Sequence, residues 1–121
     1  MSLFYIALFG ALGSLARYGV GVWARSLGVA FPYGTLIVNV AGCFILGFVS
    51  TLALEGRVSE TVRLALAAGF CGAFTTFSTF ELEVMNAVLE GRTWVAVLYV
   101  LLSLSLGFLA VFLGRFLALN L

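Results

Sequence analysis

The chain has 121 residues, of which 64% are hydrophobic and only 9% charged, and its mean hydropathy is +1.23. Soluble domains carry about a quarter charged residues, so this composition excludes a soluble domain and predicts an integral membrane protein with a single domain, residues 1–121. The net charge of +1 gives no indication of a nucleic-acid partner, and the absence of histidine argues against a zinc or transition-metal site.

Four apolar segments are long enough to cross a bilayer as helices, which takes about 20 residues. We expect these spans at Leu3–Trp23, Tyr33–Leu54, Thr61–Leu89 and Thr93–Leu119. The predicted fold class is therefore an all-α membrane protein with four transmembrane helices. No basic residue precedes the first apolar run, so we interpret it as a spanning helix and not as a signal peptide. We expect a multi-pass protein of the cell inner (plasma) membrane.

All six cationic side chains are arginines, and an even number of spans places both termini on one side of the membrane. That side would hold Arg57, Arg63 and Arg115, and the other would hold Arg25, Arg92 and, if its side chain reaches the interface, Arg17. Because three arginines oppose three, the positive-inside rule gives no preferred orientation. Either lipid and packing set the topology, or the protein inserts both ways up and pairs antiparallel. Four helices do not easily enclose a water-filled path, so we expect an oligomer.

Two strongly polar side chains fall inside the first two spans. Asn39 lies within GTLIVNVAG, where lipid offers no partner for an amide with two donors and an acceptor. It makes either an interhelical hydrogen bond, worth about 0.6–2 kcal/mol, or a ligand contact along a pathway. Arg17 in the first span either extends to the interface or attracts anions at a pore mouth.

The stretch Gly69–Phe80, GFCGAFTTFSTF, places two glycines, three threonines, a serine and a cysteine in the middle of the third span. Each glycine weakens a helix by about 1 kcal/mol relative to alanine, and hydroxyls can bond the backbone groups that a helix break releases. We therefore predict two half-helices with an irregular turn near Gly72–Thr75. Free carbonyls at such a turn could coordinate a hard cation such as sodium.

Beyond the predicted break, side chains at helical spacing form three sets that share a face. These sets are the pair Phe77 and Phe80, the stripe Thr76, Thr79 and Glu83, and, in the fourth span, the stripe Tyr99, Ser103 and Gly107. Two polar stripes and an aromatic pair could line a narrow route. Ordinary lipid or core packing is the alternative interpretation of the two phenylalanines, because the chain holds 12 of them.

Three motifs together resemble the CrcB/Fluc fluoride channels: GALGSLARY near the N-terminus, YGTLIVNVAG in the second span and GFCGAFTTFSTF in the third. The resemblance covers all four spans in order and spacing, and the third motif is the most specific. It implies a passive fluoride channel that reduces fluoride toxicity, built as a dual-topology antiparallel homodimer. It also implies two pores and a central structural sodium ion.

The resemblance also implies roles for particular residues. The sodium ligands would be the backbone carbonyls of Gly72 and Thr75 of both subunits. The fluoride pathway would include Asn39, the ring edges of Phe77 and Phe80, and a polar track with Ser103 and nearby Tyr99; Arg17 matches the family's arginine. We add Thr76, Thr79 and Glu83 as pathway residues. Some family members continue the track with a second serine where this chain has Gly107, so the length of its track is open.

Rival functions differ in the acid that they need. A small multidrug-type exporter needs a membrane carboxylate early in the chain, but the first two spans contain none. A proton-coupled fluoride carrier is a closer rival, with Glu83 as its coupling acid. A purely structural membrane subunit would leave Asn39 and the break unexplained. No nucleophile–base constellation is visible, so an enzyme is not expected.

Overall fold

A computed structural model describes the whole chain, residues 1–121, as a bundle of four long helical spans. The elements are α1 (Ser2–Ser26), α2 (Tyr33–Leu54), α3 (Glu60–Leu64), the π-helical η1 (Ala65–Cys71), α4 (Gly72–Phe74), α5 (Phe77–Leu89) and α6 (Thr93–Leu119). All four spans are long and apolar enough to cross a membrane, as predicted. The bounds of the second and fourth spans are those expected, whereas the first continues to Ser26 and the third begins at Glu60.

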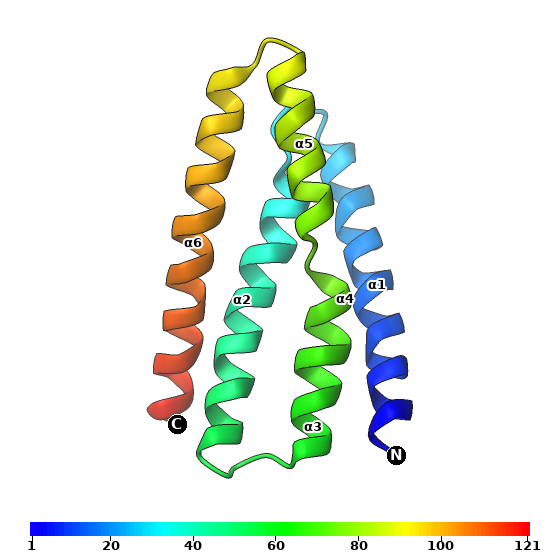
Figure 1. Ribbon diagram of the computed structural model, residues 1–121, viewed down its shortest axis with the longest axis vertical. Helices are drawn as coiled ribbons and strands as arrows, with labels where there is room; N and C mark the ends of the chain where they lie inside the picture. Colours follow the sequence, from blue (N-terminus) through cyan, green and yellow to red (C-terminus); the bar gives the residue numbers. More distant parts are fainter.

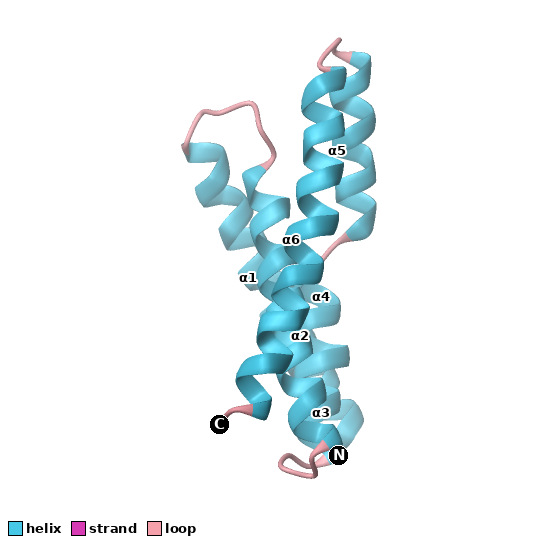
Figure 2. Cartoon of the chain, turned by 90° about the vertical axis from the view of Figure 1, so that its left-hand side faces the viewer, coloured by secondary structure: helices cyan, strands magenta, loops and turns pink.

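The third span is interrupted, as the glycine- and threonine-rich stretch predicts. The helix ends at Phe74, and Thr75 and Thr76 have extended backbone before α5 begins at Phe77. The break therefore lies at the downstream end of the predicted turn. Upstream of it, the backbone widens into the π-helix η1, a rare geometry that is frequent at functional sites and that the sequence did not indicate. Figure 2 shows the loop between the two half-helices midway along the bundle.

Both termini and the α2–α3 loop lie at one end of the bundle, and the α1–α2 and α5–α6 loops lie at the other (Figure 1). α2 packs most extensively on α6, and α1 packs on the first half of the third span. Beyond the break, α5 packs on α6. The end of the bundle that holds the α1–α2 and α5–α6 loops therefore divides into an α1–α2 arm and an α5–α6 arm (Figure 2).

Close backbone approach holds α2 and α6 together. A Cβ atom at Gly47 would collide with the carbonyl oxygen of Val111, and one at Gly114 would collide with that of Phe44. Small residues at helix–helix contacts are typical of membrane bundles, because they let the backbones approach and increase the van der Waals contact. Gly47 and Gly114 therefore form a packing seam between α2 and α6.

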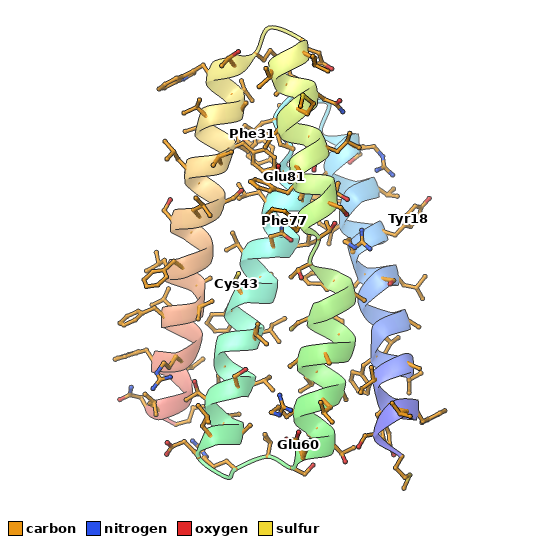
Figure 3. All side chains as sticks on the ribbon, in the orientation of Figure 1. Tyr18, Phe31, Cys43, Glu60, Phe77 and Glu81 are labelled. Atoms are coloured by element: carbon orange, nitrogen blue, oxygen red, sulfur yellow. The ribbon has the colours of Figure 1, made fainter.

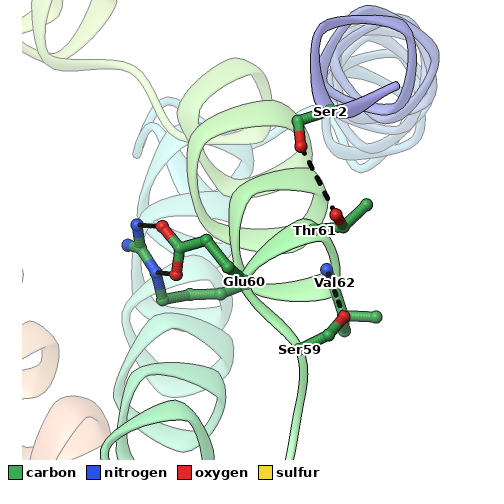
Figure 4. A network of polar contacts seen from close by, with 6 residues as sticks. Ser2, Ser59, Glu60, Thr61 and Val62 are labelled. Carbon is green, nitrogen blue, oxygen red and sulfur yellow. Dashed lines mark hydrogen bonds and ion pairs between the residues drawn. The ribbon is translucent and has the colours of Figure 1, made fainter.

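Local caps fix the end of the bundle that holds the termini (Figure 4). The Ser59 hydroxyl accepts a hydrogen bond from Val62 N at 3.2 Å and caps α3, where Glu60 pairs with Arg63 at 2.5 Å. The Ser2 and Thr61 hydroxyls lie 3.3 Å apart and join the start of α1 to the third span. Helix N-termini need such side-chain acceptors because their first N–H groups have no partner within the helix.

Most of the apolar surface remains uncovered in the single protomer. Only 19 of the 121 residues are buried, and large hydrophobic side chains are exposed along every span. Such a surface is stable only against lipid or another protein, because leaving it in water would forfeit the hydrophobic free energy of burial. The chain is therefore an integral membrane protein.

Candidate functional site

Asn39 bridges α2 to the break in the third span. Its Oδ1 accepts a hydrogen bond from Thr76 N at 2.8 Å, and its Nδ2 donates to Thr76 O at 3.1 Å. One amide side chain thus pairs both backbone groups of a residue that has left the helix. This is the interhelical hydrogen bond that the sequence left as one of two interpretations. One N–H of the amide remains for a second contact, so its role in a pathway stays a prediction.

Arg17 is held at the same break. Its Nε donates to Ala73 O at 2.9 Å, so the guanidinium lies midway along the bundle and does not extend to the membrane interface. It forms no ion pair with an acidic side chain. The arginine count then becomes three at the end with the termini and two at the other, with Arg17 between them.

The backbone carbonyls of Gly72 and Thr75 at the break lose the donors that a continuous helix would provide. In an α-helix each N–H donates to the carbonyl four residues earlier. Thr76 N would serve Gly72 O but donates to Asn39 instead, and Thr79 N would serve Thr75 O but donates to Thr76 Oγ1 at 3.3 Å. Gly72 and Thr75 therefore present carbonyl oxygens without their helical partners. No group of three or more His, Cys, Asp or Glu side chains lies together.

The hydroxyl of Thr76 starts α5. As the N-cap, it accepts from Thr79 N and lies 3.1 Å from Thr79 Oγ1 and 3.4 Å from Ser78 Oγ. An N-cap hydroxyl satisfies one of the unpaired N–H groups of the first turn. The structure thus joins the predicted pathway residues Thr76 and Thr79 into one hydroxyl cluster.

Glu83 lies farther along α5 and contacts two other helices. Its Oε1 accepts from Thr35 Oγ1 of α2 at 2.5 Å and from the Tyr99 hydroxyl of α6 at 3.4 Å. The structure therefore brings the predicted residues Glu83 and Tyr99 together. Sequence reasoning missed Thr35, although it lies four residues before Asn39 and so shares its helix face.

An aromatic cluster lies between Glu83 and the break. The Phe80 ring meets the Tyr99 ring edge to face at a centroid distance of 5.0 Å, and both residues are buried. Phe77 differs: its ring lies 6.0 Å from that of Phe80, but 74% of the residue is exposed on the protomer surface. Figure 3 places Phe77 just beyond the break. The two predicted phenylalanines are neighbours, but only Phe80 belongs to the core of a single protomer.

Ser103 is the one residue with a buried side-chain oxygen or nitrogen that has no hydrogen-bond partner. A buried hydroxyl without a partner costs about 1–3 kcal/mol, and such groups in native proteins usually meet a water, an ion or a ligand. Ser103 lines a cavity of about 370 Å³ together with Asn39, Thr76, Phe77 and Phe80. The structure thus gathers most of the predicted pathway residues around one cavity.

Two further cavities lie toward the α1–α2 loop. One of about 320 Å³ separates the two arms and is lined by Thr35, Glu83 and Tyr99. The other, of about 380 Å³, holds Arg17, Arg25 and Thr35. Because Tyr99 lines the first of these cavities and Phe80 lines the Ser103 cavity, their touching rings stand between the two spaces. The three cavities are lined by neutral donors, aromatic rings and the Glu83 carboxylate, with arginines toward the α1–α2 loop.

Comparisons with known proteins place the chain in a family. Residues 4–115 match the family described as CrcB-like protein, Camphor Resistance (CrcB). A protein of Acidobacterium capsulatum named fluoride-specific ion channel FluC is 53% identical over 116 residues, which cover 94% of this chain and 93% of the relative. Proteins with the same name from Thermus thermophilus and Solibacter usitatus are 49% and 48% identical over 110 and 120 residues, covering 90% and 98% of this chain and 87% and 98% of theirs.

The three relatives come from bacteria, where a multi-pass helical protein of this kind lies in the plasma membrane. The family match covers all four spans, and the relatives align over nearly their whole length. This chain therefore belongs to the CrcB-like protein family.

Proposed function

We propose that this protein is a fluoride-selective channel that lets fluoride leave the cell passively and so limits its toxicity. The relatives are named as fluoride-specific ion channels, a non-enzymatic class. The observation that carries the proposal is the line of uncharged donors and aromatic rings between two cavities, in which Ser103 Oγ is buried without a partner.

The chemistry of this line suits a small, strongly hydrated anion. A pore must replace the water around the ion without trapping it, because conduction needs binding that is also weak enough for exit. The Asn39 amide and the Thr79 and Ser103 hydroxyls supply hydrogen-bond donors without net charge. The Thr76 and Tyr99 hydroxyls would exchange their present bonds to Thr79 and Glu83 for bonds to the ion. The ring edges of Phe77 and Phe80 carry partial positive charge and attract an anion weakly. Arg17, beside the second cavity, would concentrate anions near the pathway.

Efflux from liposomes containing the purified protein tests this function. Fluoride should leave without a proton gradient, and chloride should leave far more slowly. Efflux no faster than from empty liposomes would refute the channel. Movement that strictly requires counter-moving protons would favour a fluoride carrier with Glu83 as its coupling acid, a carboxylate that already accepts hydrogen bonds from two neighbouring helices.

Matched substitutions of the two phenylalanines test the ring edges. Phe77→Ile and Phe80→Ile keep apolar volume roughly comparable and cost less than about 1.5 kcal/mol of stability if the rings only pack. In a pathway the folded protein should persist while fluoride flux falls sharply. Phe77→Met and Phe80→Met serve as controls, because the polarizable thioether should retain part of the anion contact. Wild-type flux in well-folded isoleucine variants would remove both residues from the pathway.

The active form in this proposal is an antiparallel dual-topology homodimer. The near balance of arginines at the two ends gives little orientational bias. The exposed Phe77 and the cavity that it lines would gain their missing wall from a second subunit. Accessibility of a C-terminal tag from both sides of native membranes would support dual topology, and a single orientation would refute it. Two or three lysines added at one terminus should bias insertion and lower flux.

A structural sodium ion at the dimer axis completes the proposal. The N–H groups that would bond the carbonyls of Gly72 and Thr75 in a continuous helix bond side chains instead, so these two carbonyl oxygens lack their helical partners. Backbone carbonyls of this kind are the ligands that unwound membrane helices offer to sodium. Two such carbonyls from each subunit would coordinate a hard cation, which adds positive potential near the pathway without moving. An experimental structure of the dimer should contain a non-water peak between the paired third spans, contacted by these oxygens. Unbroken third helices or an absent peak would refute the ion.

A further inference from the structure

α2 and α6 run in the same direction and keep one register along their contact. Thr35 and Tyr99 both reach Glu83, and four residues on Asn39 and Ser103 line one cavity. This order defines rungs, each made of one α2 residue and the α6 residue beside it. The Thr35/Tyr99 and Asn39/Ser103 rungs each carry polar groups from both helices.

The next rung pairs Cys43 with Gly107, again four residues on in each helix. A Cβ atom at Gly107 would lie 3.5 Å from Cys43 Sγ, an ordinary van der Waals contact. Gly107 is buried and has no side chain, so the thiol lies against the place where a side chain from α6 would begin. Cys43 also lines the cavity that holds the unpartnered Ser103 hydroxyl, and Figure 3 places it midway along α2.

We propose that the Cys43 thiol is the third polar rung of the fluoride pathway and supplies, beside Gly107, the donor that α6 lacks there. The inference rests on the proposed channel function. A thiol is a weak hydrogen-bond donor, suited to a step at which an anion must be passed on and not held. The same position makes Cys43 a site where a soft metal ion can attach and close the pathway, since thiols are preferred ligands of soft metals.

Substitutions of Cys43 distinguish a role as hydrogen-bond donor from a role in packing alone. Cys43→Val keeps the shape but removes the donor, and should lower fluoride efflux roughly 2- to 10-fold, the rate equivalent of one hydrogen bond. Cys43→Ser keeps a donor and should retain wild-type flux or exceed it. Gly107→Ser in the Cys43→Val background should restore flux, because position 107 accepts a Cβ and its hydroxyl would enter the same rung. A packing role would not be rescued by a hydroxyl on the other helix.

Mercuric chloride provides a chemical test on the wild-type protein, with two cysteine variants to identify the thiol that reacts. The thiol would exchange its proton for mercury, forming an S–Hg bond while one Hg–Cl bond breaks and a proton and a chloride leave. Wild-type efflux should be blocked, Cys71→Ala should remain sensitive and Cys43→Ser should be resistant. Cys71 is the matched control because it is buried and lines the same cavity.

The outcomes distinguish the two proposals. If wild-type protein passes no fluoride, the channel function itself fails. If wild-type protein passes fluoride but resists mercury, or if resistance follows Cys71→Ala instead, the third rung is refuted. Wild-type flux in folded Cys43→Val would refute it as well.

Discussion

Two regions hold this bundle together in different ways. Along the α2–α6 seam, glycines at positions 47 and 114 bring one backbone directly against another. At Thr75–Thr76, the backbone leaves the helix. Side chains from α1, from α2 and from Thr76 at the break itself replace the lost helical hydrogen bonds. The seam depends on the absence of side chains, whereas the break depends on a few particular ones.

This difference follows from the solvent. Lipid gives apolar helices no hydrophobic reason to associate, so close van der Waals packing must supply the contact. Lipid also offers no partner to a free N–H or C=O group, so an irregular backbone persists only where protein covers and pairs it. We expect substitutions to act through clashes at the seam and through unpaired backbone groups at the break.

The largest effect is expected from Asn39→Ala. It removes the partners of both Thr76 backbone groups, and each polar group left buried without a partner costs about 1–3 kcal/mol. The melting temperature of the detergent-solubilised protein should fall, and hydrogen exchange should rise at Thr76. Ile37→Ala, at an exposed apolar position of the same helix, is the control and should change neither strongly. Unchanged exchange at Thr76 would contradict the bridging role of Asn39.

An intermediate effect is expected from Gly114→Ala, which drives a Cβ into the carbonyl of Phe44. Overpacking costs about 1–3 kcal/mol, and here backbone atoms must move. Gly107→Ala on the same helix is the matched control, because its Cβ would only reach ordinary contact with Cys43. Thermal unfolding of both variants measures the difference. Equal stability of the two variants would show that the α2–α6 seam tolerates a side chain at position 114.

The smallest effect is expected from Thr76→Ala, which removes the cap of α5 and the hydroxyl contacts with Ser78 and Thr79. Loss of an N-cap hydroxyl costs about 0.5–2 kcal/mol, and Thr79 N would lose its acceptor. Thr76→Ser retains the oxygen and should stay close to wild type. Exchange of the first-turn amides of α5 reports the change locally. A serine variant as unstable as the alanine variant would attribute the loss to the methyl group instead of the cap.

The sequence predicts the spans well because their physics is local. Tyr33–Leu54 and Thr93–Leu119 are long apolar runs bounded by charged or turn residues, and the structure reproduces both ranges. Gly72 and the following threonines placed the break within two residues of its observed position. The π-helical stretch before the break was not foreseen, because nothing in the residues Ala65–Cys71 distinguishes it from an ordinary helix.

The contacts between spans were harder to predict from the sequence than the spans themselves. Thr35 was missed, since its importance comes from Glu83, which lies 48 residues later. Arg17 had two open interpretations, and only the position of Ala73 shows that it caps a freed carbonyl. Phe77 and Phe80 share a face, yet one is buried and the other exposed, because the Tyr99 ring meets Phe80 alone.

By itself, the sequence determined that the chain lies in a membrane, where its second and fourth spans begin and end, and that the third must break. These properties depend on hydropathy, glycine and hydroxyl content, which act over one turn or one span. The tertiary structure decided which side chain pairs each freed backbone group, and that the Thr35, Asn39 and Cys43 stripe faces the Tyr99, Ser103 and Gly107 stripe. Helix spacing fixes which residues share a face, but only packing fixes which face meets which neighbour and at what register.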